Sequence, residues 1–217
     1  MNSFILLEKS KTGADFSERL KENIQKGCCY SWLLKIDQLL NNIPEQEELL
    51  TKKFAPIKNV HQLFDKLAEL LVAYEYLDLK PVFNSDSISG PDLFLNKTLE
   101  FVEVKRLNNS DSQNSILESL LRSSATRTAT NEGDDSGQVA AVNKKLKDHI
   151  DKALLQMGKN KGKIVVLYSL DLLGYINSLD NREADFLQYG KRYVASLNTK
   201  DIEFHFVRTN DLFSCKV

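Results

Sequence analysis

The sequence predicts an α/β fold in which a central mixed β-sheet is flanked by helices. Two observations carry this prediction. Apolar residues recur three and four apart in the segments 59–79, 138–157 and 182–198, the period of an amphipathic helix. Short runs of strand length, at 80–84, 90–107, 163–170 and 201–208, stand between them. The resulting order of helix, three strands, helix, strand, helix and strand is typical of a sheet covered on both faces.

The first part of the chain, 1–57, contains helical patterns interrupted at Gly27 and Pro44 and no obvious strand, so we expect a helical extension that caps the core. The segment 59–79 is apolar on most sides of its helical wheel, which predicts a central, largely covered helix. The run "KIVVLYSL" at 163–170 is typical of a strand inside a covered sheet, whereas the alternation in 201–208 favours an edge strand.

Between the third strand and the helix at 138–157, residues 108–137 are rich in Ser, Thr, Asn, Asp and Gly. One short helical pattern, 115–124, interrupts them. Such a composition is typical of a mobile loop or a partly ordered insertion.

The composition excludes several classes of protein. The 29 Lys and Arg residues nearly balance 30 Asp and Glu residues, so affinity for a polyanion would require local patches. No apolar run approaches the roughly 18 residues of a membrane span, and the N-terminus lacks the features of a signal peptide. The three cysteines, Cys28, Cys29 and Cys215, fit reduced thiols better than disulfides or a zinc site. We therefore expect a cytoplasmic protein without a membrane partner.

Charged residues follow an apolar run in "GPDLFLNKTLEFVEVKRL", residues 90–107. Because strand residues alternate between faces, Phe101, Glu103 and Lys105 share a face with Leu99, opposite Val102 and Val104. A two-residue loop at Asn96 and Lys97 would pair Leu95 with Thr98 and would place Asp92 diagonally beside Glu103 on that face. A three-residue loop would turn Asp92 to the other face.

Two carboxylates at one end of a sheet repel each other, and burial adds a desolvation cost. A divalent cation removes both costs, and oxygen ligands favour Mg²⁺ or Mn²⁺. Such an ion activates water and polarises phosphate, while Lys105 could orient the water or balance charge in the transition state. The chemistry that fits Asp92, Glu103 and Lys105 best is hydrolysis of a phosphodiester. The alternative without a function is that Glu103 and Lys105 form an exposed ion pair on an edge strand, which contributes little to stability.

At these residues the chain resembles the PD-(D/E)XK nuclease superfamily, whose fold is that of restriction endonucleases. The motif reads "PD" at Pro91 and Asp92 and "EVK" at Glu103 to Lys105. The resemblance implies a restriction-endonuclease-like core, a metal held by Asp92, Glu103 and the carbonyl of Val104, and Lys105 as the residue that orients the water.

The resemblance also implies an acidic residue on the preceding helix, for which Glu69 fits the family spacing better than Glu75 does. Glu69 is thus a candidate catalytic and metal-binding residue. Some members carry a glutamine on the following helix, often with a tyrosine four residues later. Gln156 is similarly placed here, but Asn160 follows it instead.

Basic residues near this site are candidates for binding a nucleic-acid backbone. They comprise Arg106, Lys144, Lys145 and Lys152, with Gln156 beside them, and Arg122 and Arg127 from the preceding loop. A solvated helix face is the commoner explanation of such a run of lysines. We interpret His149 as a surface or boundary residue.

Together these features predict a metal-dependent nuclease domain at 58–217, with DNA expected as substrate rather than RNA from the habits of the family. A homodimer would suit cleavage of both strands of a duplex. A role in defence or restriction is compatible with the chain, although no residue indicates it. The alternative is an inactive nucleic-acid-binding or protein-binding module with the same fold.

Overall fold

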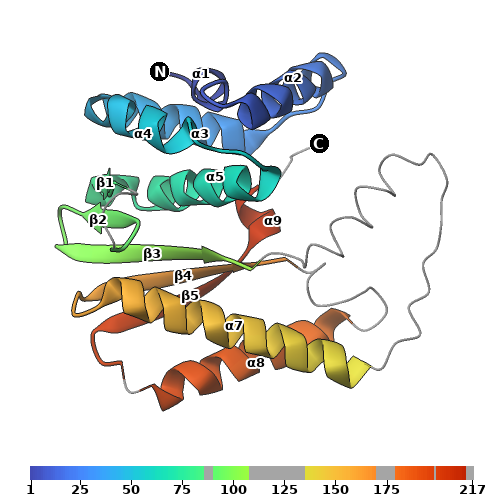
Figure 1. The fold of residues 1–217 in the computed structure, drawn as a ribbon, viewed down its shortest axis with the longest axis vertical. Coiled ribbons are helices and arrows are strands. Elements are labelled where there is room, and N and C mark those ends of the chain that lie inside the picture. The colour runs from blue at the N-terminus through green and yellow to red at the C-terminus, as the bar shows by residue number, and fades with distance from the viewer. Residues whose placement is uncertain (86–89, 108–134, 170–178, 198, 214–217) are drawn as a thin grey trace.

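A five-stranded mixed sheet, in the order β1-β2-β3-β4-β5, forms the centre of the protein in the computed structural model (Figure 1). The structure describes residues 1–85, 90–107, 135–169, 179–197 and 199–213. The strands are β1 (Pro81–Phe83), β2 (Leu93–Leu95), β3 (Glu100–Arg106), β4 (Gly162–Tyr168) and β5 (Ile202–Arg208). The pairs β1–β2 and β2–β3 are antiparallel, and the pairs β3–β4 and β4–β5 are parallel. The predicted mixed sheet is therefore confirmed, with β4 inside it and β5 at its end.

Helices cover both faces of this sheet. They are α1 (Ser3–Leu7), α2 (Lys11–Gln25), α3 (Ser31–Asn42), α4 (Glu47–Phe54), α5 (Val60–Glu75), α7 (Asp135–Met157), α8 (Leu179–Ser196) and α9 (Thr209–Leu212), with 3-10 turns at Pro44–Gln46 and Leu77–Leu79. Among the described helices, none is both long and apolar enough to cross a membrane. The expected helical piece at 115–124 and the loop residues Arg122 and Arg127 lie outside the described residues.

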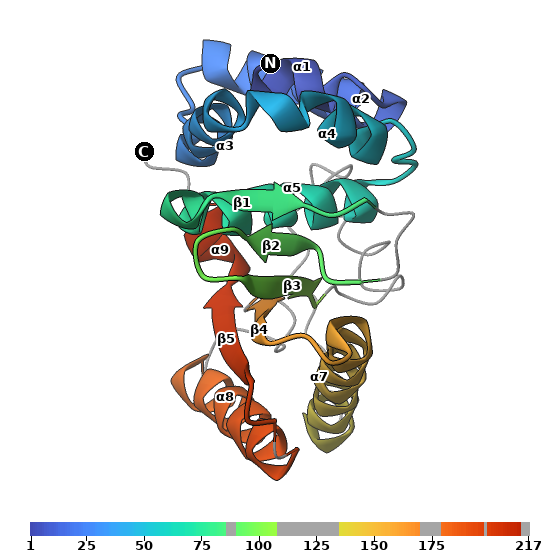
Figure 2. The same ribbon diagram turned by 90° about the vertical axis from the view of Figure 1, so that its left-hand side faces the viewer.

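The helix α5 lies between the sheet and the N-terminal helices (Figure 2). It starts at Asn59, whose side chain accepts a hydrogen bond from the N–H of Gln62, as an N-cap residue does. Its buried side chains point in several directions, and Leu67, Leu70 and Leu71 are almost completely buried. The prediction of a central, covered helix is confirmed.

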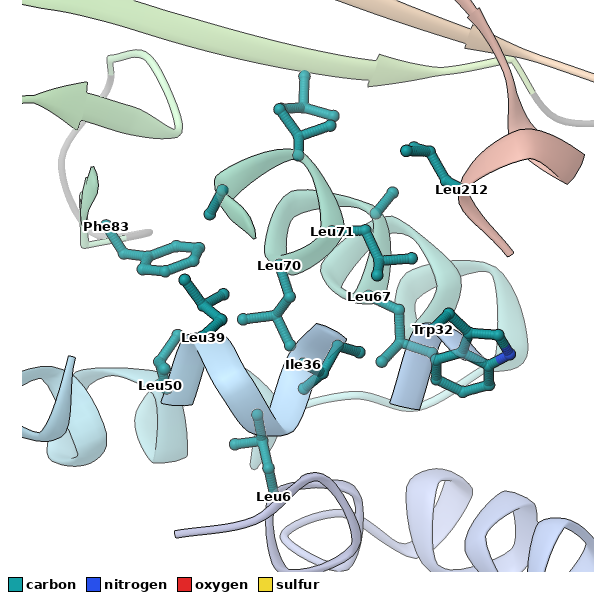
Figure 3. Packing of buried hydrophobic residues seen from close by; sticks show 14 of the residues in the cluster. Leu6, Trp32, Ile36, Leu39, Leu50, Leu67, Leu70, Leu71, Phe83 and Leu212 are labelled. Carbon is teal, nitrogen blue, oxygen red and sulfur yellow. The ribbon is translucent and has the colours of Figure 1, made fainter. Parts of the chain in front are cut away.

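The N-terminal helices share one hydrophobic core with α5 and one face of the sheet. Leu6, Ile36 and Leu50 pack in the same cluster as Leu67 and Phe83 (Figure 3). The side chain of Gln46 also bonds to β1, donating to the carbonyl of Pro81 at 3.0 Å and accepting from the N–H of Phe83 at 2.7 Å. The outer edge of β1 is thereby closed by the N-terminal segment.

On the other face of the sheet, α7 and α8 form the two crossover connections of the parallel strands. Their apolar faces pack in a second cluster that contains Leu146, Ile150, Met157, Ile164 and Phe186. The sheet separates this cluster from the first, and β3 has α5 on one side and α7 on the other (Figure 1).

Candidate active site

The candidate site lies where β3 extends beyond β2. The last residue of β3 with a partner in β2 is Val102, opposite Leu93, so no described strand pairs with Glu103 to Arg106 on that side. A cleft of about 340 Å³ opens there, between α5 and α7. Its lining comprises Gln62, Asp65, Lys66, Glu69, Asp92, Val104, Lys105, Arg106 and His149.

The loop that joins β2 to β3 differs from the expected hairpin. Leu95 pairs with Glu100 rather than Thr98, so the loop contains four residues, Asn96 to Leu99, and the prediction of a two-residue loop is wrong. Leu99 belongs to this turn, with φ of 56° and its N–H donated to the carbonyl of Leu95 at 2.9 Å. Because four is also an even number, the register still brings Asp92 to the face of Glu103, directly opposite rather than diagonal.

Asp92 closes part of the open edge of β3. Its Oδ2 accepts a hydrogen bond from the N–H of Val104 at 2.8 Å. Since the N–H and C=O of one strand residue point to the same side of the strand, the carbonyl of Val104 faces the same edge. Burial, and then the negative charges of Glu69 and Glu103, raise the pKa of Asp92 well above its ordinary value. The hydrogen bond from Val104 and the positive charge of Lys105 offset only part of this shift, so the ionised form of Asp92 is incompletely compensated.

Glu103 is completely buried. Its Oε1 accepts a hydrogen bond from Nζ of Lys105, and its Oε2 is buried with no hydrogen-bond partner among the described residues. Burial raises the pKa of Glu103, although the charge of Lys105 opposes that shift. The pair is therefore no exposed edge-strand ion pair, because Lys105 is only 19% exposed and Glu103 has no exposed surface.

Glu69 borders the cleft from α5, as the family spacing predicted, but both of its oxygens are engaged. Oε2 lies 3.2 Å from Nζ of Lys53, a buried lysine of α4, and Oε1 lies 2.8 Å from Nζ of Lys66. Glu75, the other candidate, instead pairs with Lys35 at 2.9 Å and does not line the cleft. The carboxylate of Glu69 contributes negative charge beside Asp92 while two ammonium groups hold it in place.

Arg106 lines the cleft, but its guanidinium is bound to α5. Nε donates to Oδ1 of Asp65 at 2.8 Å, and a terminal nitrogen donates to the carbonyl of His61 at 3.0 Å. The guanidinium also lies over the ring of Phe64, 5.8 Å from its centroid. Only 13% of the side chain is exposed, so Arg106 joins β3 to α5 in this structure.

The candidate residues of α7 fall on two faces. Lys145, Lys152 and Gln156 lie with His149 on one stripe, because their spacings of three, four and seven residues are close to whole helical turns. Lys144 is exposed on the neighbouring face. The stripe reaches the cleft through His149, which lines it. The sequence was interpreted as placing His149 at the surface or the boundary, and its side chain is indeed half-buried.

The cleft offers some of the oxygen ligands that a divalent cation requires. No group of three or more His, Cys, Asp or Glu side chains within the described ranges is arranged to hold a metal. Asp92, Glu103 and the carbonyl of Val104 nevertheless supply the two carboxylates and the neutral oxygen that suit Mg²⁺, which keeps several waters of its own. The unpartnered Oε2 of Glu103 is a buried anionic oxygen that a cation would satisfy. The donor set therefore fits a hard, hydrated ion.

In comparisons with known proteins, no protein family, curated protein or solved structure matches this chain.

Proposed function

We propose that this protein is a metal-dependent nuclease that hydrolyses phosphodiester bonds, in DNA rather than RNA, with a core of the PD-(D/E)XK type. One observation carries the proposal. Asp92 and Glu103 lie opposite each other at an open strand edge, and Glu103 keeps a buried oxygen without a partner. A protein with no need for an ion would gain stability by replacing these groups with neutral ones, since such burial is costly.

Asp92 and Glu103, with the carbonyl of Val104, would hold Mg²⁺ or Mn²⁺. When bound, such an ion activates water and stabilises charge on the phosphate and on the leaving oxygen. Glu69 supports this set by its charge, because Lys53 and Lys66 already hold its oxygens. The raised pKa of Asp92 and of Glu103 in the ion-free protein means that metal binding competes with protonation of these groups.

Around these carboxylates the cleft is rimmed by cations. Lys105 and Lys66 line it, and Lys145 and Lys152 lie on the α7 stripe next to it. Ammonium groups attract the phosphate backbone without reading sequence. In the proposal Lys105 donates hydrogen bonds to the water or the phosphate, and the lysines of α7 hold the strand across the cleft.

The proposal predicts that the full chain cleaves single-stranded or double-stranded DNA with Mg²⁺ or Mn²⁺ and that EDTA stops the cleavage. Asp92→Ala, Glu103→Ala and Lys105→Ala should each reduce kcat by about 100-fold or more, because each removes a ligand or donor at the reacting phosphate. Gel assays on labelled DNA and RNA oligonucleotides, with calorimetric titration of the metal, measure both effects.

Glu75→Gln is the matched control, since it changes an acidic residue on α5 whose side chain pairs away from the cleft. Its activity should equal that of the wild type. Cleavage that survives in all three site variants would refute the proposed site. A wild type that binds DNA but neither cleaves nucleic acid nor binds metal would instead identify the inactive binding module.

A further inference from the structure

His149 presents one defined ring nitrogen to the cleft. Its Nδ1 lies 2.9 Å from the carbonyl oxygen of Lys145, one turn earlier in α7. A carbonyl oxygen only accepts hydrogen bonds, so Nδ1 carries the proton. In the neutral ring, Nε2 then holds the free lone pair, and it lies on the side of the ring turned away from the helix backbone. No described residue hydrogen-bonds Nε2, although the ring lines the cleft.

The surroundings of His149 favour the neutral ring. Burial lowers its pKa. The hydrogen bond to the carbonyl of Lys145 opposes that shift, and the positive charges of Lys145, Lys152 and Lys105 add to it. Lys145 and Lys152 lie on α7 itself and Lys105 on β3, while Lys66, Glu69 and Asp92 face the same cleft from α5 and from the residue before β2. Near neutral pH the ring is therefore an acceptor in a place that is otherwise rich in donors.

The proposed reaction needs such an acceptor. A water that attacks phosphorus must direct a lone pair at it, and an acceptor for one of its hydrogens fixes that orientation. The ammonium of Lys105 has three donors and no acceptor, so it cannot fill that role. The carboxylates of Asp92 and Glu103 are assigned to the metal in the proposed function. Nε2 of His149 is the remaining cleft acceptor on the α7 side.

We propose that Nε2 of His149 accepts a hydrogen bond from the attacking water and orients it toward the phosphorus. This inference rests on the proposed nuclease function and adds a residue that the motif does not contain. The water enters from the α7 side of β3, between the ring of His149 and Lys105, and the same stripe that carries Lys145 and Lys152 holds the strand being cut.

Two amide variants separate this role from a structural one. The amide nitrogen of His149→Asn takes the place of Nδ1 and can still donate to the carbonyl of Lys145, but nothing replaces Nε2. The amide of His149→Gln reaches the place of Nε2 and offers an acceptor there, but the bond to Lys145 is lost. Steady-state cleavage of a DNA oligonucleotide with Mg²⁺, with melting temperatures of both variants, gives the comparison.

We expect His149→Asn to lose about 10-fold to 100-fold in kcat with KM and melting temperature close to those of the wild type, because orientation of the water is lost while binding remains. His149→Gln should retain more activity than His149→Asn. The proposal is overturned if His149→Asn is as active as His149→Gln or more active. A histidine with a purely structural role would be replaced best by asparagine, which keeps the bond to Lys145. Where His149→Gln does not fold, His149→Asn decides alone, and a loss smaller than about threefold overturns the proposal.

Asp92→Ala in the same assay keeps the two conclusions separate. When the wild type cleaves and Asp92→Ala does not, the nuclease function stands, and a fully active His149→Asn removes only the role given to His149. No cleavage by the wild type under any condition removes both.

Discussion

At the scale of single residues, the cleft keeps two carboxylates where burial disfavours their charge. Glu103 has no exposed surface, and Asp92 lies opposite it with a third acidic side chain, Glu69, nearby. The hydrogen bond from Val104 and the ion pair with Lys105 compensate only part of that cost. Function at this site is therefore expected to oppose the stability of the metal-free fold.

The pH dependence of stability tests whether these carboxylates destabilise the metal-free fold. The folded-state pKa values of Asp92 and Glu103 are raised, so their contribution to stability is present at low pH, below the pKa of the unfolded chain, and is lost as the pH rises through the folded values. Asp92→Asn cannot ionise. In EDTA it should match the wild type near pH 4 and exceed its free energy of unfolding by about 1 kcal/mol or more at pH 8.

Urea unfolding at a series of pH values measures this difference. When the free energy of the wild type is subtracted from that of the variant, the contributions of groups that titrate in both proteins cancel. Mg²⁺ should reduce the difference in free energy of unfolding between the two proteins, because it stabilises the wild type alone. A variant that is less stable than the wild type at pH 8 in EDTA would show that the ionised Asp92 is well compensated.

The positions of some of these residues could be predicted from the sequence, and those of others could not. Strand alternation placed Glu103 and Lys105 on one face, since that rule needs only local geometry. The ion pair of Glu69 with Lys53 was missed because Lys53 comes from another helix, 16 residues earlier. His149 was missed for a similar reason, as its place in the cleft depends on how α7 crosses the sheet rather than on any motif around it.

At the scale of elements, the connection between β2 and β3 shows what a local pattern leaves open. The strands, the inner place of β4, the edge place of β5 and the covered helix α5 follow from apolar periodicity, and the structure confirms them. The length of the turn does not follow, because "NKTL" contains no glycine to identify the residue with positive φ. Leu99 takes that conformation, although a branched apolar side chain disfavours it.

Replacement of Leu99 by a residue that tolerates this backbone should stabilise the turn. Leu99 is 67% exposed, so little packing is lost, and Leu99→Asn should raise the free energy of unfolding by about 0.5–1 kcal/mol. Thr98→Asn is the matched control in the same exposed loop and should leave stability nearly unchanged, because Thr98 does not have positive φ. Chemical denaturation of both variants is the measurement, and a destabilised Leu99→Asn would contradict this account of the turn.

At the scale of the whole molecule, the N-terminal helices are joined to the sheet by more than a linker. They share the first hydrophobic cluster with α5, Gln46 bonds to the edge of β1, and Lys53 holds Glu69 beside the cleft. The segment 1–57 was expected to cap the core, and the side chains that make this cap reach from the sheet edge to the candidate site.

Deletion of residues 1–57 should therefore destroy cooperative folding. It would expose Leu67, Leu70 and Phe83 along one face of α5 and the sheet, and it would remove Lys53, one of the two lysines paired with Glu69. We expect the fragment 58–217 to lose its sharp thermal transition and to bind a hydrophobic dye, in contrast to the full chain. A fragment that melts cooperatively near the temperature of the full chain would show that this layer is dispensable for the fold.

The short length of β2 has a further consequence for the behaviour of the protein in solution. An unpaired strand edge is a template for intermolecular pairing and aggregation. Beyond Val102, a foreign strand would have to displace Asp92 from the N–H of Val104 and settle beside Glu103 and Lys105. The charged groups of the candidate site thus also protect this part of the sheet from self-association.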